Sequence, residues 1–577
     1  MSLEGTTAGF ADLLLSGAAV VDPARGLGAD SVAVAGDRIL AVGRGGELGR
    51  LVGPQTRTLS CRGCSLLPGL IDGHAHMDRE GLKTLLPSLA GARSIDDVLA
   101  VIADEVRRRR PGEWVVTMPI GTPPLYLDGA DGLREGRWPT RHDLDRVAPD
   151  NPVFIRPIWG YWRNRPPLVS VANSLALRIA GIDAATASLS PLVEIERDPV
   201  SGAPTGLFRE DTQMSIVELT LMAKAPNFRL EDRIAGLERS MGVYNGFGTT
   251  AVYEGHGVAA EVISAYQAVR DRGRQTVRAT LVLSPAWSTA GSAEDVRRML
   301  REWGGWATRR GFGDGWLRLQ GVYAERDETA EGRLRAAAAP QTGWAGFNYD
   351  AGLPAPLLEE LLLEAARNGF RVSTIFQDVS DMFPRIDRQV PIGGLRWVRG
   401  HIAVMEDEEI ARAKDLGLVL VTHTNRHIAK MGSRHLARLG PARQSSIVPL
   451  RRLIDRGVPV ALGSDNLPPS LFEPIADVHF RRDRATGEVV APDQAISRAE
   501  AFALASQGGA WLLGREEELG QIAPGYLADL VVVEGDVRTM SEEDLRSARA
   551  RQTLVGGRVV QGPPAEVGAF PRLEVLQ

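Results

Sequence analysis

The stretch from Leu66 to His76 constrains the fold of this chain more than any other. It reads Leu-Leu-Pro-Gly-Leu-Ile-Asp-Gly-His-Ala-His, an apolar run that ends in two histidines. Pro68 and Gly69 interrupt the run and can lie only near the start of a strand or in an irregular turn. His74 and His76 are two residues apart, so on an extended backbone they point to the same side. Because neutral imidazole is the commonest transition-metal ligand, the stretch predicts a buried strand that presents a metal-binding pair.

The setting of these histidines carries more information than the pair itself. A bare His-x-His favours two polar loop histidines after a core strand, but Pro-Gly-x-x-Asp-x-His-x-His resembles the first barrel strand of the amidohydrolase superfamily of metal-dependent hydrolases. The whole chain is most similar to the branch that contains N-substituted formamide deformylases. The resemblance implies a (β/α)₈ TIM barrel, with metal at the C-terminal ends of its strands, beside a small β-sandwich.

Composition excludes several classes of function. The chain has 577 residues, more than one domain needs, and a net charge of −5, too small to suggest a nucleic-acid or membrane partner. No apolar run is long enough to span a bilayer, and no basic leader precedes the first apolar run, so we expect a cytoplasmic enzyme with a small-molecule substrate. A homodimer is left open. Cys61 and Cys64 exclude a disulfide framework, and we interpret them as ordinary small residues in a turn before the barrel strand.

The two chain ends share one pattern. Short apolar runs punctuated by Gly and Asp occupy residues 11–59, and similar runs occupy 528–560. Neither half has a sufficient core alone. In the family that the chain resembles, the two ends pair into one sandwich, which implies that residues 1–65 and 518–577 flank a barrel domain at 66–517.

Between the ends, strand-like and helical segments alternate. Residues from about 80 to 230 resemble the family's insertion, which covers the barrel mouth and contributes to the substrate pocket. Eight strand-like segments, interspersed with helical patterns, predict an α/β barrel. A doubly wound open sheet is the alternative fold, but no Gly-x-Gly-x-x-Gly fingerprint supports it. The eight segments begin at residues 66, 248, 279, 317, 371, 397, 418 and 458.

Polar residues at the C-terminal strand ends are the candidates for chemistry, because these ends face the active site of a barrel. Five of the nine histidines fall at or just beyond such ends. Asp465 resembles the family's strand-eight aspartate, whose roles are metal contact and proton acceptor; a helix N-cap is the structural alternative. His401 resembles the strand-six histidine, which implies a ligand or a substrate contact. The full set of strand-end candidates is His74, His76, Glu254, His256, Tyr323, His401, His423 and Asp465.

Two positions depart from the family's pattern. Tyr323 stands where relatives carry a bridging carboxylated lysine, and Ile375 stands where the strand-five histidine is expected. We therefore expect one Zn²⁺, with another divalent ion as the alternative, per chain rather than two metal ions. His423 is a candidate compensating ligand, whereas His427, four residues on, is expected at the surface. The predicted metal ligands are His74, His76, His401, His423 and Asp465.

The insertion offers candidate substrate contacts. Trp159, Tyr161 and Trp162 form an aromatic cluster, for which core packing and a pocket wall are both open interpretations. We predict Trp162 as a substrate contact, together with Tyr323 and His256 at the strand ends.

The leading hypothesis is a metal-dependent hydrolase of a C–N bond in an amide, N-acyl or N-formyl compound, with Asp465 and His401 as catalytic residues. A second hypothesis keeps the fold and the metal but makes the chain a lyase or isomerase, such as a decarboxylase or dehydratase. A third is a metal-poor homologue without catalytic activity.

Overall fold

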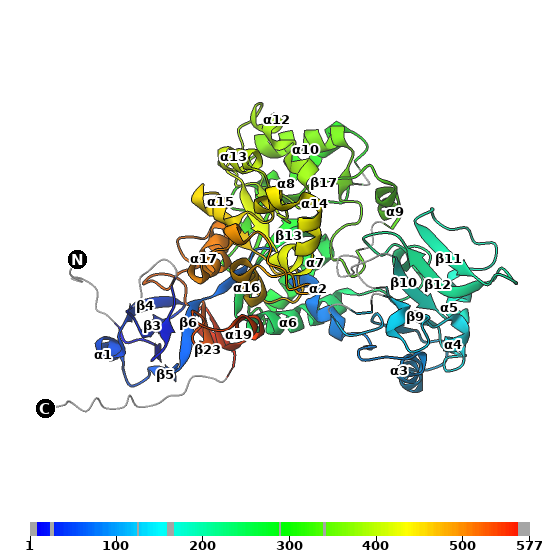
Figure 1. The fold of residues 1–577 in the computed structure, drawn as a ribbon, viewed down its shortest axis with the longest axis horizontal. Helices are drawn as coiled ribbons and strands as arrows, with labels where there is room; N and C mark the ends of the chain where they lie inside the picture. Colours follow the sequence, from blue (N-terminus) through cyan, green and yellow to red (C-terminus); the bar gives the residue numbers. More distant parts are fainter. Residues whose placement is uncertain are drawn as a thin grey trace.

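The computed structural model describes residues 9–22, 28–123, 126–127, 129–157, 167–287, 290–338 and 342–562. Three units are arranged side by side in Figure 1. A barrel occupies the centre, and a sandwich built from the two chain ends lies on one side. A module built from residues between 95 and 210 lies on the other side.

Eight parallel strands form the central barrel. Neighbouring strands pair in the order β22-β21-β20-β19-β16-β14-β13-β7. The two end strands meet where the Gly73 N–H donates to the Leu462 carbonyl at 2.9 Å and the Asp465 N–H donates to the His74 carbonyl at 3.0 Å. These contacts close the barrel, and the predicted α/β barrel is confirmed. The strands are β7 (Leu70–Asp72), β13 (Thr249–Val258), β14 (Arg278–Leu283), β16 (Leu317–Tyr323), β19 (Val372–Thr374), β20 (Val398–Arg399), β21 (Val419–Thr422) and β22 (Val460–Leu462).

Helices that bury one face cover the barrel. In α8, for example, Val296 and Leu300 are buried, and Ser292 caps the helix by accepting the Asp295 N–H. The main helices of this layer are α6 (Leu230–Gly246), α7 (Ala260–Asp271), α8 (Ala293–Ala307), α10 (Ala355–Arg367), α13 (Asp407–Asp415), α15 (Leu450–Asp455), α16 (Phe472–Phe480) and α17 (Arg498–Ala503).

Both chain ends build the sandwich, as predicted. One sheet has the order β4-β3-β1-β5 and comes from the N-terminal end, whereas the other, β2-β6-β23-β24-β25, mixes both ends. In Figure 1 the blue and red strands therefore lie together. The strands are β1 (Leu13–Ser16), β2 (Ala19–Val20), β3 (Ser31–Ala35), β4 (Arg38–Gly43), β5 (Arg57–Ser60), β6 (Cys64–Pro68), β23 (Leu530–Glu534), β24 (Ala550–Val555) and β25 (Arg558–Gln561).

The stretch predicted as a single strand is two strands in two different sheets. β6 ends at Pro68 and pairs with β23 of the sandwich, whereas β7 begins at Leu70 in the barrel. Gly69 lies between them, and a Cβ at this position would lie 2.2 Å from the Thr250 Oγ1. Only glycine permits that close approach. The cysteine prediction is also partly wrong, because Cys64 begins β6 rather than lying in a turn.

The third unit is built around a sheet of order β11-β12-β10-β9-β8. Its apolar residues, such as Phe154 and Phe208, share a core with Trp344 and Phe347 from the segment that follows β16. The unit therefore packs against a connection at the C-terminal side of the barrel. Its elements are α3 (Ile95–Arg107), β8 (Val115–Thr117), α4 (Arg141–Asp145), β9 (Val153–Ile155), β10 (Leu168–Ala172), α5 (Ser174–Ala180), β11 (Val193–Arg197) and β12 (Pro204–Glu210).

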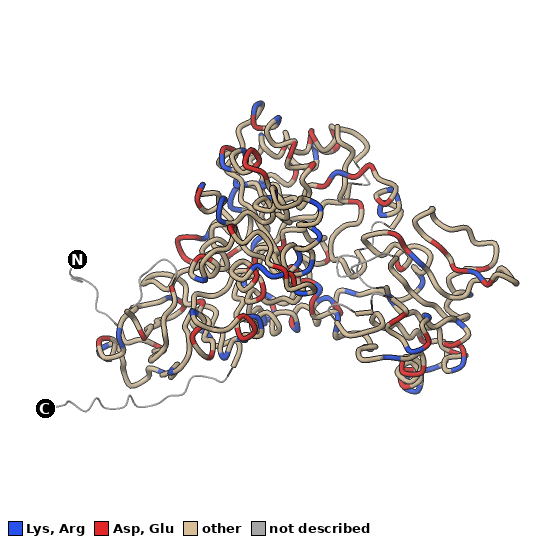
Figure 2. The backbone as a smooth tube through the Cα atoms, in the orientation of Figure 1, with Lys and Arg blue, Asp and Glu red and all other residues tan. Residues whose placement is uncertain are grey.

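Charged residues of both signs are interleaved over all three units in Figure 2, in the part of the chain drawn in colour. Within the described ranges, no helix combines the length and apolarity needed to cross a membrane.

Candidate metal and active site

The ends of the first and last barrel strands are locked together by a buried carboxylate. Asp72, at the end of β7, accepts the Ser464 hydroxyl at 2.6 Å, the Ser464 N–H at 3.0 Å and the His74 N–H at 3.1 Å. Burial raises the pKa of Asp72 to about 6. This network fixes the segments that carry His74 and Asp465 relative to each other.

Asp465 is the meeting point of the predicted site. Its Oδ1 lies 2.8 Å from the His76 Nε2 and 3.7 Å from the His74 Nε2, and its Oδ2 lies 3.5 Å from the His423 Nε2. His401 adjoins this group, with its Nε2 3.2 Å from the His74 Nε2. The five residues predicted as metal ligands from four separate strand ends thus form one cluster.

The backbone at this cluster is strained. Asp465 has φ of +52° and His401 has φ of +55°, a region that residues other than glycine seldom adopt. His74 is also closely enclosed, because a Cβ on Gly463 would lie 2.6 Å from the His74 Cβ. Strain and close packing of this kind persist where the surrounding structure holds side chains in fixed positions.

The histidine cluster is larger than predicted. His427 is buried, and its ring centroid lies 4.7 Å from that of His423, so the expectation of a surface position is wrong. The ring of His435, in α14 (Gly432–Leu439), lies 6.0 Å beyond. The His-x-x-x-His spacing of residues 423 and 427 is the signal in the sequence that indicates the larger cluster, because it places both imidazoles on one helix face.

Burial keeps these imidazoles neutral. It lowers the pKa values of His74, His76, His401 and His423, and neighbouring cationic or imidazole groups lower several of them further. Burial has the opposite effect on the carboxyl of Asp465, whose pKa it raises. A neutral imidazole has the lone pair that a metal ligand requires.

His76 differs from the other imidazoles because Arg79 contacts its Nδ1. A guanidinium can only donate, so Nδ1 accepts and the neutral ring carries its proton on Nε2, facing Asp465. Binding an ion through Nε2 requires that proton on Nδ1, where Arg79 now donates. Asn466 holds the same segment, since its Nδ2 donates to the His76 carbonyl at 2.7 Å. Sequence analysis identified neither Arg79 nor Asn466.

Glu254 takes part in a neighbouring acidic group. Its Oε1 accepts the Met77 N–H at 2.9 Å, the Asp78 N–H at 3.2 Å and the Tyr266 hydroxyl at 2.7 Å. Ligand atoms of His76, Asp78 and Glu254 lie within 4.8 Å of one another. The hydrogen bonds to Glu254 indicate that this carboxylate positions the start of α2 (Met77–Glu80).

Two of the predicted substrate contacts, Tyr323 and His256, lie beside each other in the structure. Tyr323 and His256 are buried with ring centroids 5.0 Å apart, and Phe347 stacks on His256 at 4.4 Å. Ile375 is buried among core residues of the barrel. Trp159, Tyr161 and Trp162 lie outside the described residues.

A cavity of about 600 Å³ lies at the opposite end of the barrel, beside the starts of β19 and β20. Arg371, Arg396 and Arg515 line it together with Glu516. Residues at this end of a barrel contribute mainly to stability. We therefore do not assign the cavity to the site.

The donor set fits a transition-metal ion. His74, His401 and Asp465 have ligand atoms within 4.8 Å of one another, as do His401, His423 and His427. Neither ring nitrogen of His423 has a hydrogen-bond partner among the described residues. Buried imidazole and carboxylate donors of this kind suit zinc and its neighbours better than Mg²⁺ or Ca²⁺.

The chain is similar to known proteins in sequence and in fold. The chain is 26% identical to an N-substituted formamide deformylase of Arthrobacter pascens over 557 residues, which cover 92% of this chain and 95% of that protein. It is 23% identical to the putative amidohydrolase YtcJ of Bacillus subtilis (strain 168), over 88% of this chain and 91% of that protein. An uncharacterised metal-dependent hydrolase from Pyrococcus furiosus shares the fold, with a TM-score of 0.64 and 19% identity over 91% of this chain and 100% of that one.

The family assignment rests on a match over nearly the full length. Residues 57–561 match the model of the amidohydrolase family, from β5 of the sandwich through the barrel to β25. The resemblance inferred from the first barrel strand is confirmed. The chain belongs to the amidohydrolase family and is an enzyme of the amidohydrolase type.

Proposed function

We propose that the chain hydrolyses a C–N bond of a small amide, N-acyl or N-formyl compound, with Asp465 as the proton acceptor. The observation that carries this proposal is the convergence of His74, His76 and His423 on the two oxygens of one buried aspartate at the barrel mouth. The relative from Arthrobacter pascens is named for a reaction of this class.

His74, His76, His401, His423 and Asp465 are the residues that would hold a divalent ion, with zinc as the expected one. Such an ion supplies Lewis-acid activation of water and of the substrate carbonyl. His74 is buried, His401 is half-buried and both imidazoles are neutral, so each can direct a lone pair into the site. His76 can contribute only with its proton on Nδ1, which makes it the ligand most dependent on Arg79.

Asp465 would carry the proton transfers. A carboxylate at this position accepts the proton of the attacking water and returns it to the leaving nitrogen, which departs as a neutral amine. The locked β7 and β22 ends keep its oxygens fixed during both transfers, and little reorganisation is then needed.

His401, Tyr323 and His256 would orient the substrate. As the alternative to its role as a ligand, His401, which lies beside His74, would donate an N–H to the substrate carbonyl oxygen as negative charge develops there. Tyr323 and His256 remain the predicted contacts for the acyl or amine substituent; their ring centroids lie 5.0 Å apart, and Phe347 stacks on His256. Trp162 remains a predicted contact.

Metal content and product mass test the proposal together. The purified full-length chain is analysed for bound metal and then screened on N-acyl and N-formyl compounds in H₂¹⁸O. Hydrolysis adds one water across the substrate and places ¹⁸O in the released acid. A product that has lost carbon dioxide or water would instead support the lyase alternative, and a chain without bound metal or turnover on the whole panel would contradict the proposal.

A further inference from the structure

Two neighbouring imidazoles have no hydrogen-bond partner on either ring nitrogen in the part of the chain that the structure describes. Within the described ranges, Nδ1 and Nε2 of both His423 and His427 are buried and unpartnered. The carboxylate of Asp465 is 3.5 Å from His423, beyond a normal hydrogen bond to nitrogen. A buried polar group without a partner costs about 1–3 kcal/mol, so four such atoms side by side indicate that a ligand belongs between the rings.

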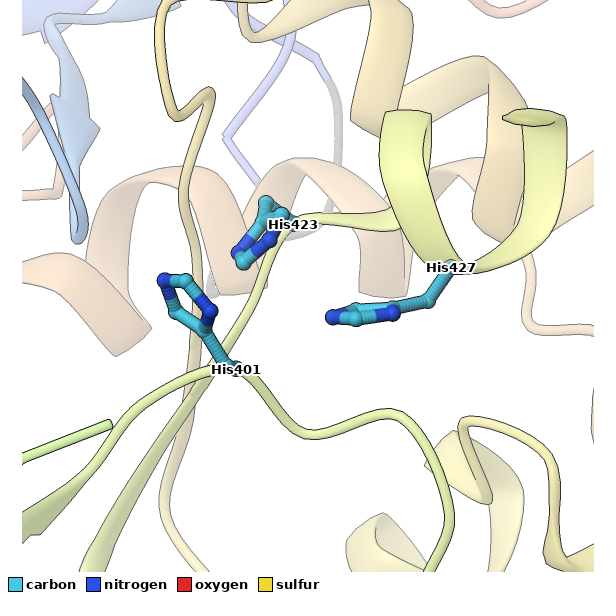
Figure 3. A group of neighbouring side chains, drawn as sticks. All are labelled: His401, His423 and His427. Atoms are coloured by element: carbon cyan, nitrogen blue, oxygen red, sulfur yellow. The ribbon is translucent and has the colours of Figure 1, made fainter. Parts of the chain in front are cut away.

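His401 completes this group. The ring centroid of His401 lies 4.2 Å from that of His423 and 6.4 Å from that of His427, and one ligand atom from each ring falls within 4.8 Å of the other two. Figure 3 shows the three rings facing one common space, with His401 and His423 on strand ends and His427 on the helix that follows β21. Three elements of the barrel thus aim imidazoles at one point.

The backbone holds His427 in this position. It lies in a π-helical turn, Asn425–Lys430, a form of helix that is rare and concentrated at functional sites. The side chain of Asn425 donates to the Ser464 carbonyl at 2.6 Å and so ties the start of this turn to the loop that carries Asp465. Fixed outer contacts of this kind orient metal ligands.

We infer that His401 and His423, instead of completing the ion site of His74, His76 and Asp465, join His427 in a second, three-imidazole site for a transition-metal ion. Three imidazoles select zinc, cobalt, nickel or copper over Mg²⁺ and Ca²⁺. Three protein ligands also leave one coordination position for water or substrate. The inference goes beyond the proposed function and revises the expected stoichiometry from one ion per chain to two.

The experiment compares three single variants of the full-length chain. Each is stripped with a chelator and titrated with Co²⁺ or Zn²⁺, and bound metal is counted by elemental analysis and by the visible spectrum of Co²⁺. His427→Gln removes a ligand of the inferred site, His74→Gln removes one from the proposed catalytic group, and His435→Gln is a matched control for a buried histidine outside both. Circular dichroism establishes that each variant is folded.

We expect two equivalents in the natural chain and in His435→Gln. His427→Gln should lose one equivalent or bind it more than about 100-fold more weakly, since loss of even an outer-shell partner costs 10–100-fold. His74→Gln should keep that equivalent and lose the other. His427→Cys, which puts a thiolate ligand in place of the imidazole, should recover binding. It serves as the test if His427→Gln does not fold.

Two results would overturn the inference. One is unchanged metal content and affinity in His427→Gln relative to His435→Gln, which would leave the space to water. The other is one shared equivalent lost in both His427→Gln and His74→Gln, which would indicate a single mixed centre. Failure of the proposed function is a separate outcome, recognised by the absence of hydrolysis while both equivalents are bound.

Discussion

Replacing Asp465 with asparagine tests the proton acceptor with little disturbance of the site. The side chain is buried, with Oδ1 2.8 Å from the His76 Nε2. Asparagine has the same size and keeps one oxygen, so it can still accept the His76 N–H and contact an ion. It cannot accept a proton at neutral pH, and the change therefore removes the proposed chemistry while preserving the shape.

The expected loss follows from what a positioned general base contributes. Such a group accelerates a reaction by roughly 10²–10⁴, so kcat of Asp465→Asn should fall by that factor. The corresponding increase in barrier is about 3–5 kcal/mol. The KM should change less than kcat, because the proton transfer belongs to the transition state rather than to substrate binding.

The assay measures turnover and metal content on the same samples. Asp378→Asn is a matched control, because Asp378 is an exposed carboxylate that follows β19 at the same end of the barrel. The acid limb of the pH–rate profile should vanish in Asp465→Asn if this carboxylate sets it. An Asp465→Asn enzyme with full metal content and near-normal turnover would remove Asp465 from the mechanism.

Three further predictions address the scaffold. Truncation after Gly520 removes β23 to β25, strips the partner of β6 and should give insoluble chain; a stable soluble product in a sedimentation assay would contradict a shared sandwich. Gly463→Ala would place a Cβ 2.6 Å from the Cβ of His74. It should lower the free energy of thermal unfolding by about 1–3 kcal/mol and weaken metal retention. Gly304→Ala, whose added Cβ meets nothing within 4 Å, should do neither. Glu210 is buried, and desolvation raises its pKa from 4.5 to about 8, so its contribution to stability is present below pH 4.5 and is lost as pH rises through 8. Glu210→Gln should remove most of that loss, which is on the order of 3 kcal/mol by pH 7. Urea unfolding of both proteins at pH 5 and pH 7 measures it, and an equal change in the free energy of unfolding between the two pH values would refute the assignment.

The barrel and its family were predictable because their signals are local. Many of the barrel strands contain a short apolar run, and the polar residue or glycine that follows the run is visible directly in the sequence. The pair His74 and His76 needs only the two-residue period of an extended chain to be recognised. Asp465 was found in the same way, from the residues at the end of its own strand.

The wider site could not be predicted because its residues come from remote parts of the chain and meet only in the folded structure. His427 was expected at the surface, since a His four residues after another indicates a helix face but not which way that face points. Only the packing of the π-helical turn against the Asp465 loop directs it inward. The contact of Arg79 with His76, which decides the proton position on that ring, is likewise a matter of tertiary placement.

The sequence by itself determined the order of the strands, the residue at each strand end and the donor types available to an ion. The tertiary structure decided which of those donors meet. Closure of β7 against β22 brings His74 and Asp465 together from positions almost 400 residues apart in the chain, and the split at Gly69 sends one apolar run into two sheets. Such choices depend on steric fit between distant segments, as at Gly69 beside Thr250, and no local pattern encodes that fit.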